Sequence, residues 1–349
     1  MRKVATVLLI SALISHCLIS DVKAEEKSRL LLQGEKHLRN MKQLTFGGKN
    51  AEAYFSFDGT RLIFQSTRDG FQCDQIFVMN VDGSDVRRVS TGEGQTTCAY
   101  FFPGDQEILY SSTHPAGPDC PPVPARAKRY IWSLHPFEIF TANVDGRDLK
   151  RLTFTKDYNA EATVSKDGKI VFTSLREGDL DIYVMNKDGS GVKRLTHQKG
   201  YDGGAFFSPD GTMIVYRAFH PKKSEDLKEY EEHLGKRQVV GGTLELFVMK
   251  SDGSDQRQIT DNGASNFCPF FLPNGRQIIF SSNLNKPEGR EFNLYLINVD
   301  GTGLERITLH PGFDSFPMFS PDGKKLVFVS NRNAKQPGEF NIFMADWVP

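Results

Sequence analysis

The stretch Phe319-Ser320-Pro321-Asp322-Gly323-Lys324, with the apolar run that follows it, decides the fold of this chain. An Asp-Gly pair between two apolar runs favours a tight turn, because such turns need positive φ angles, and it predicts a β-hairpin. The phrase recurs five more times, closely at 207–212, more loosely at 55–59, 164–168 and 271–275, and in scrambled form at 101–105. The chain is therefore built from six repeats.

A second phrase follows the first in the repeats. It reads Ile-Phe-Val-Met-Asn, then a turn with Asp-Gly, then a basic-apolar-Thr ending, and clear examples begin at Ile76, Ile182, Leu246 and Leu294. Each repeat thus predicts four short strands, which we name A and B on either side of the first turn and C and D on either side of the second. Four antiparallel strands per repeat are typical of a β-propeller blade.

The two ends of the chain predict a closed ring. The last repeat stops at strand C, residues 341–347, and has no D strand. A lone D phrase, Lys42-Gln43-Leu44-Thr45, precedes the first repeat and can complete the last blade. Such closure removes an exposed sheet edge. We predict an all-β fold, a six-bladed β-propeller of four-stranded blades closed by an N-terminal strand.

The repeats resemble those of the TolB-like, WD40-like propeller family over about residues 40 to 347. The resemblance implies an exported binding protein, but propellers host many functions. TolB proper carries a separate α/β domain before its propeller, whereas only a short segment precedes the ring here. The hydrolase domain of propeller peptidases is not expected either, because the sequence has no Gly-x-Ser-x-Gly elbow.

The beginning of the chain predicts export. Residues 1–24 combine a basic start, an apolar run and small residues before Glu25, as in a secretory signal peptide. An uncleaved anchor and lipid attachment at Cys17 are the alternatives. We expect a lead segment at 25–40, a propeller at 41–349, and a periplasmic or secreted monomer. The formal net charge of zero gives no reason to expect a nucleic-acid partner, and no later stretch is suited to cross a membrane.

Four cysteines follow the predicted signal peptide. An oxidising compartment favours disulfides, and Cys73, Cys98 and Cys120 are the candidates because all three are expected on one face near blades 1 and 2. A disulfide among them would hold the insertion of blade 2 in place. Cys268, at the start of a strand A, is expected to be buried and free.

The same face, formed by the D–A and B–C connections, is the predicted place of function. Two B–C connections are long, at about 114–137 and 220–242, and long loops on a rigid scaffold often bind partners. The alternative is that they only cap the channel. The candidate binding residues lie at strand ends near the channel and in these loops, and they are Glu52, Arg68, His114, Asn159, Glu161, Arg176, Asp202, Arg217, His220, Asn266, Asp314 and Arg332. Ion pairing between blades is the alternative role for each charged member.

Two function classes follow. The first is a non-enzymatic scaffold that holds a protein segment or a small polar ligand on this face, with no cofactor. The second is a carbohydrate lyase or hydrolase at the same face, in which Glu52 and Glu161 act as acid and base, or His114 and His220 join carboxylates around a divalent metal. We expect the first, with no catalytic residue assigned.

Overall fold

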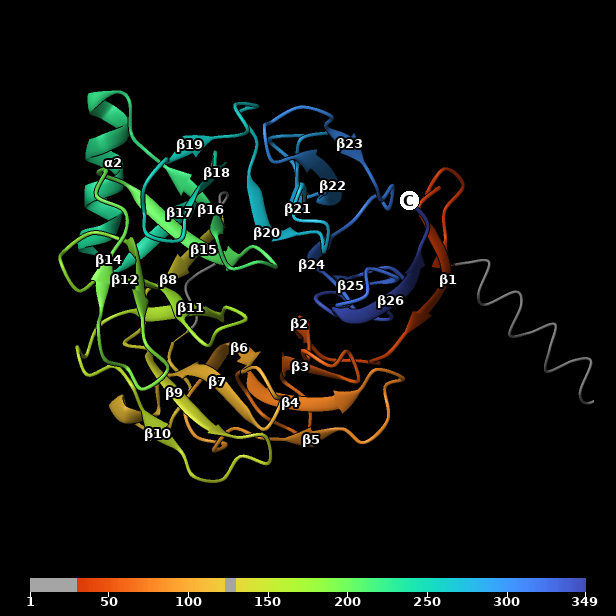
Figure 1. The fold of residues 1–349 in the computed structure, drawn as a ribbon, viewed down its shortest axis with the longest axis horizontal. Helices are drawn as coiled ribbons and strands as arrows, with labels where there is room; N and C mark the ends of the chain where they lie inside the picture. Colours follow the sequence, from red (N-terminus) through yellow and green to blue (C-terminus); the bar gives the residue numbers. More distant parts are fainter. Residues whose placement is uncertain (1–29, 123–129) are drawn as a thin grey trace, which may run out of the picture.

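The computed structural model describes residues 30–122 and 130–349. It contains six four-stranded antiparallel sheets, which radiate from a central axis like the blades of a propeller (Figure 1). In each sheet the first strand of the repeat lies nearest the axis and the short last strand lies at the rim. The predicted six-bladed fold is confirmed.

The blades follow one another in chain order. Blade 1 consists of β2 (Asn50–Phe55), β3 (Arg61–Ser66), β4 (Gln75–Asn80) and β5 (Arg87–Arg88). Blade 2 consists of β6 (Thr96–Phe101), β7 (Glu107–Ser112), β9 (Glu138–Asn143) and β10 (Lys150–Arg151). Blade 3 consists of β11 (Asn159–Val164), β12 (Ile170–Ser174), β13 (Asp181–Met185) and β14 (Lys193–Arg194). Blade 4 consists of β15 (Tyr201–Phe207), β16 (Met213–Phe219), β18 (Glu245–Lys250) and β19 (Arg257–Gln258). Blade 5 consists of β20 (Asn266–Phe271), β21 (Gln277–Ser282), β22 (Asn293–Asn298) and β23 (Glu305–Arg306).

Blade 6 joins the two ends of the chain. It contains β24 (Asp314–Phe319), β25 (Lys325–Ser330), β26 (Asn341–Trp347) and, at the rim, β1 (Leu38–Gln43). β1 pairs antiparallel with β26, and the amide of Leu44 extends the pairing by donating to the carbonyl of Ile342 at 2.8 Å. The ring is therefore closed by the N-terminal strand, as predicted.

The lead segment and the start of β1 contribute side chains to the apolar core. Leu30, Leu38 and Met41 are buried in the apolar core of blades 5 and 6. The pairing strand begins at Leu38, three residues before the expected start of the propeller, because Leu38 already packs into this core. The predicted signal peptide, 1–24, lies outside the described residues.

The two insertions meet each other. The insertion of blade 2 contains a 3-10 helix, His114–Ala116, and strand β8 (Tyr130–Ser133); that of blade 4 contains helix α2 (Ser224–Gly235) and strand β17 (Gln238–Gly241). β8 and β17 form a separate two-stranded antiparallel sheet, although their blades are separated by blade 3. Figure 1 shows α2 at the periphery of this side of the ring, with β8 closer to the axis.

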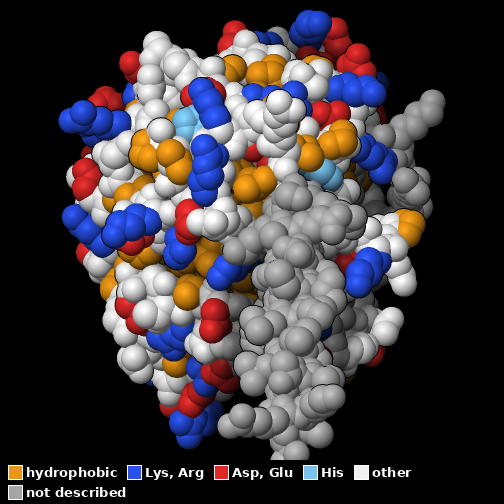
Figure 2. Space-filling model, turned by 90° about the vertical axis from the view of Figure 1, so that its right-hand side faces the viewer, with side chains coloured by type: hydrophobic (Ala, Val, Ile, Leu, Met, Phe, Trp, Pro, Cys, Tyr) orange, Lys and Arg blue, Asp and Glu red, His pale blue; other side chains and the backbone are white. Residues whose placement is uncertain are grey.

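The core lies within and between the blades. Strands B and C of every blade are almost wholly buried, since each sheet is covered by its neighbours on both faces. The outer surface carries mixed charges: Figure 2 shows Lys and Arg side chains interspersed with Asp and Glu on the face it presents. Within the described residues, no helix is long and apolar enough to span a membrane.

Candidate functional site

A β-bulge in the innermost strand of every blade turns one residue toward the axis. The register shifts at the same place in β2, β6, β11, β15, β20 and β24. The bulged residue has a φ angle between 51° and 60° in each case. Positive φ angles are unusual for residues other than glycine, and their recurrence in all six blades indicates that the bulge is a regular feature of the repeat. These six residues, which we call the channel ring, are Glu52, Cys98, Glu161, Gly204, Cys268 and Phe316.

The channel ring brings together groups from different blades. The carboxyl of Glu52 interacts with the thiol of Cys98, and its pKa responds to the charges of Glu161 and Arg217. Since these residues belong to blades 1, 2, 3 and 4, they can meet only at the axis. The structure therefore places two of the predicted carboxylates, Glu52 and Glu161, in one cluster with Arg217.

Glu161 is fully engaged by its neighbours. Its carboxylate forms an ion pair with Arg217 and accepts hydrogen bonds from Thr173 at 2.8 Å and from the hydroxyl of Tyr201 at 3.1 Å. The amide of Gly204 donates to it at 2.9 Å. Four donors thus hold the Glu161 carboxylate in place, and it anchors the guanidinium of Arg217.

Glycine at the channel-ring position of blade 4 makes this ion pair possible. A β-carbon on Gly204 would collide with the guanidinium of Arg217. The guanidinium also lies against the rings of Tyr201 and Phe267, with centroid distances of 5.6 and 5.1 Å. Arg217 was expected beside Arg68, Arg176 and Arg332 at the ends of the B strands. It instead lies three positions earlier than those arginines in the equivalent strand, opposite Gly203 within β16, and reaches into the channel.

Glu52 differs from Glu161 because, within residues 30–122 and 130–349, no Lys or Arg forms an ion pair with it. Burial raises the pKa of Glu52 to about 7, and the negative charge of Glu161 adds to this effect. Asp74 lies nearby, and burial raises its pKa to about 6. The side chain of Gln65 links the two regions: it donates to Asp74 at 3.3 Å and accepts from the amide of Cys98 at 3.2 Å. This side of the channel therefore holds two carboxyl groups that titrate near neutrality.

Aromatic rings fill the channel below the channel ring. Tyr54 contacts Tyr100 and Phe206, with centroid distances of 5.7 and 5.5 Å, and Phe206 contacts Phe270 at 5.5 Å. These rings come from blades 1, 2, 4 and 5 and meet across the axis, so we call them the aromatic plug. Tyr54, Tyr100 and Phe206 are buried, whereas Glu52 is only half-buried. Solvent therefore reaches Glu52 from the loop face.

The β8–β17 sheet borders the channel mouth on that face. The ring of Trp132 in β8 contacts Tyr201 and Phe267 at 5.6 and 6.4 Å, and these are the rings that flank Arg217. Tyr130, two residues earlier on the same face of β8, is 64% exposed. Desolvation raises the pKa of Tyr130, the charges of Glu52 and Asp74 add to this shift, and the charge of Arg217 opposes it. Tyr130 is therefore an exposed aromatic side chain beside the charged mouth.

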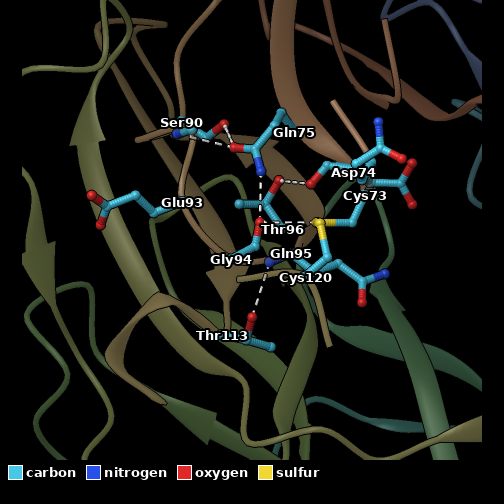
Figure 3. The surroundings of a disulfide bond; sticks show 12 residues. Cys73, Asp74, Gln75, Ser90, Glu93, Gly94, Gln95, Thr96, Thr113 and Cys120 are labelled. Carbon is cyan, nitrogen blue, oxygen red and sulfur yellow. Dashed lines mark hydrogen bonds between the residues drawn. A yellow bond between two sulfur atoms is a disulfide. The ribbon is translucent and has the colours of Figure 1, made fainter. Parts of the chain in front are cut away.

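A disulfide ties the insertion of blade 2 to blade 1. Cys73 in the B–C loop of blade 1 is bonded to Cys120, and the Cys73 sulfur lies 3.2 Å from the carbonyl of Gly94 (Figure 3). The amide of Gly94 in turn donates to the carbonyl of Pro118 at 2.7 Å. Of the three candidate cysteines, Cys98 stays a free thiol in the channel ring, and Cys268 is buried and free.

Five of the predicted loop-face residues occupy one equivalent position, two residues after the last pair between strands B and C of their blades. Each contacts an aromatic ring of its own blade: Arg68 contacts Phe64, His114 Phe140, Arg176 Phe172, His220 Phe247 and Arg332 Phe328. They serve to pack the top edge of each blade, and they lie around the ring rather than in one place. We do not retain them in the proposed site.

Four further candidates are wholly buried at the start of strand A. Asn159 accepts from Ser174 at 2.8 Å, and Asn266 donates to the carbonyl of Leu244 at 2.7 Å. Asp202 bonds His220 at 2.9 Å, and Asp314 pairs with Arg332 at 2.8 Å. These bonds fasten each strand A to its own or the preceding blade, which agrees with the alternative structural role. The side chains have no exposed surface to offer a ligand.

The histidines suggested as metal ligands are far from a shared site. His114 bonds Ser112 at 2.8 Å in blade 2, and His220 bonds Asp202 in blade 4, on either side of blade 3. Across residues 30–122 and 130–349, no three His, Cys, Asp or Glu side chains are grouped as metal ligands. The donor set that the metal hypothesis requires is therefore not assembled by these residues.

A second concave region lies outside the channel. A groove of about 470 Å³ separates α2 from blade 3, and its lining residues include Arg176, Glu231 and Arg237. Arg237 forms an ion pair with Asp157 across it. Both charges are thereby partly neutralised, so the groove is a weaker candidate for ligand binding than the channel mouth.

Three residues at the channel mouth, Asp74, Tyr130 and Trp132, are not among the candidates predicted from the sequence. Asp74 was overlooked although it follows Cys73, because nothing local shows that it faces the channel. Tyr130 and Trp132 lie in a noted insertion, but their place beside the axis depends on pairing with β17. An aromatic pair in a long loop is the only sequence signal that could have drawn attention to them.

Comparisons with known proteins show the fold. A structure named "putative TolB" from Agrobacterium tumefaciens aligns with a TM-score of 0.58 and 19% identity, covering 86% of this chain and 91% of that one. A gluconolactonase from Xanthomonas campestris gives 0.55 and 13%, covering 89% and 91%. An oligogalacturonate lyase from Vibrio parahaemolyticus gives 0.52 and 12%, covering 88% and 93%. No protein-family model and no curated protein matches the sequence.

The protein is thus a six-bladed β-propeller with a TolB-like fold. Similar structures include both TolB and enzymes, and at these identities the likeness concerns the fold alone. What distinguishes this chain within the fold is the charged channel mouth and the sheet that two distant insertions build beside it.

Proposed function

We propose that the protein is an exported, non-enzymatic binding protein that holds a segment of a partner protein at its channel mouth. One observation carries this proposal. The two long insertions do not cap their own blades but pair with each other beside the axis, where they present the exposed Tyr130 above Glu52 and Arg217. Ring closure does not need this sheet, since β1 and β26 close the ring elsewhere.

The chemistry of the mouth suits a peptide. Aromatic side chains such as Tyr130 and Trp132 supply contact area at low entropic cost, and the carboxyl groups of Glu52 and Asp74 can accept hydrogen bonds or pair with a cation. The aromatic plug closes the channel below, so a ligand would enter from the loop face. Export to the periplasm or outside, as a monomer, is part of the proposal and rests on residues 1–24 and on the resemblance to TolB-like propellers.

Site-specific cross-linking in the native host tests this function. A photoreactive phenylalanine analogue replaces Phe313 in one variant and Asp188 in another. Phe313 directly precedes β24 on the loop face, where its ring contacts Phe292 and Phe340, and Asp188 lies in a C–D turn on the opposite face. We expect discrete adducts with a partner protein from position 313 only, and competition by unlabelled protein. Adducts from position 188 alone, or none from either, would contradict a binding function at the mouth.

An enzyme is the second candidate, and one observation favours it. A carboxyl group with a pKa of about 7 can act as a general acid or base, and Glu52, which lies near the carboxyl group of Glu161, has such a pKa. Glu161 is committed to Arg217, so Glu52 would have to do the proton transfer. Turnover of oligosaccharides that is lost in Glu52→Gln would establish this candidate, and no turnover by the wild type would remove it.

A further inference from the structure

Among the described residues, the sheet beside the channel mouth has one unpaired edge. In the part of the chain that the structure describes, β8 pairs only with β17, and β17 lies between β8 and helix α2. The other edge of β8 therefore faces the channel side. An unpaired edge of this kind is a template for a further strand.

The backbone groups on that edge follow from the register. Residues Tyr130 to Ser133 pair with Gly241 to Gln238, and the next amide, that of Leu134, donates to the carbonyl of Arg237 at 2.8 Å. In an antiparallel pair, the backbone groups of successive residues point alternately to the partner strand and away from it. Trp132 and Tyr130 therefore bond β17, while Ile131 and Ser133 present their N–H and C=O groups to the open edge.

The side chains near this edge define the character of a ligand. Trp132 packs beneath the sheet against Tyr201 and Phe267, and the exposed ring of Tyr130 stands beside the mouth. Among the described residues, the acidic groups that face this region are Glu52, Asp74 and Glu161, which is paired with Arg217, and the cations are Arg217 and the exposed Lys49. Because Arg217 is committed to Glu161, the uncommitted carboxyl groups, Glu52 and Asp74, favour a cation.

Building on the proposed function, we propose that the partner segment binds as an extended strand on the open edge of β8, with a lysine or arginine directed to Glu52 and Asp74. Backbone hydrogen bonds to Ile131 and Ser133 would supply affinity without regard to sequence. The carboxyl groups and the ring of Tyr130 would select a basic side chain, since aromatic faces also attract cations.

Proline at one position separates strand addition from other binding modes. Ser133→Pro removes an outward N–H and leaves the bonds of Trp132 and Leu134 to β17 intact, as proline on an edge strand can. Ser133→Ala keeps the N–H and is the matched control. For the charge, Glu52→Gln is compared with Glu93→Gln, which removes an exposed carboxylate from the D–A loop of blade 2 on the same face.

The probe is a displayed library of random short linear peptides, selected on the whole protein at pH 8. We expect enriched peptides to share a basic residue and to bind Ser133→Pro and Glu52→Gln at least about fivefold more weakly, and the two controls as well as the wild type. Circular dichroism and thermal unfolding establish that each variant is folded. These results would support strand addition.

Two other outcomes would overturn it. Peptides that depend on Glu52 but bind Ser133→Pro like the wild type would show that the mouth holds a segment in another way, which leaves the proposed function standing. Peptides without a basic residue, or no enrichment over an unrelated protein, would remove the inference, and cross-linking from position 313 then decides the proposed function by itself.

Discussion

The guanidinium of Arg332 bonds both carboxylate oxygens of Glu35, at 3.1 and 3.2 Å, across 297 positions of the sequence. Arg332 also pairs with Asp314 at 2.8 Å and donates to the carbonyl of Leu30. Burial tends to lower the pKa of Arg332, but the two carboxylates outweigh it and raise that pKa. The lead segment is thus fastened to the last blade by a buried ion network in addition to the β1–β26 pairing.

Removal of Glu35 should therefore destabilise the ring. We expect Glu35→Ala to lower the free energy of unfolding by about 2 to 4 kcal/mol, because it leaves a buried guanidinium with one carboxylate instead of two. The neighbouring Lys36→Ala removes a surface ion pair with Glu305 and should cost under about 1 kcal/mol. Denaturant unfolding measures both, and equal losses in the two variants would contradict the network's role.

Stability should depend on the titration of Glu52. Its pKa is raised to about 7 from 4.5, so between these values the folded protein holds a proton that the unfolded chain releases. The stability contributed by this group is fully present below about pH 4.5 and is lost as the pH rises through 7. Glu52→Gln keeps the neutral shape and should raise the unfolding free energy at pH 8 by on the order of 2 kcal/mol, with little effect at pH 5. Thermal unfolding at the two pH values measures this, and equal gains would argue against a raised pKa.

Reduction of the disulfide should weaken the fold. The bond closes a loop with a sequence separation of 47 residues, for which chain entropy gives a stabilisation of at most about 4 kcal/mol. We expect a reductant to lower the melting temperature of the wild type and to leave that of the Cys73→Ser/Cys120→Ser variant unchanged. If the reductant also lowered the melting temperature of that variant, the loss in the wild type would have a cause other than reduction of this disulfide.

The Glu161–Arg217 pair should behave as a coupled unit. Arg217→Met leaves a buried carboxylate without its cation and should cost about 3 kcal/mol or more, whereas adding Glu161→Gln should restore part of the loss. A double-mutant cycle by denaturant unfolding gives the coupling energy. Because Arg217 lowers the pKa of Glu52, the pKa of that carboxyl should also rise in Arg217→Met, which carbon-detected NMR can follow. Additive effects of the two substitutions would mean that the pair does not interact.

The candidate site was only partly predictable. The prediction that Glu52, Glu161 and Arg217 belong to the channel region came from their place near strand A or at the end of strand B, and the structure brings these three together. Arg68, Arg176 and Arg332 lie three positions further along their strands than Arg217 does, and there each guanidinium packs against an aromatic ring of its own blade. Register at a strand end decides this, and the sequence does not show it.

The sequence by itself determined the six repeats, the four strands of each and the closure of the ring, because turn residues and alternating apolar runs are local signals. Only the tertiary structure decided that Glu35 fastens to Arg332, that Cys73 bonds Cys120, and that β8 pairs with β17 over the intervening blade. Each of these contacts joins residues that are distant in the chain and close in the ring. Their partners are set by how the blades are arranged around the axis, and no local pattern of residues carries that information.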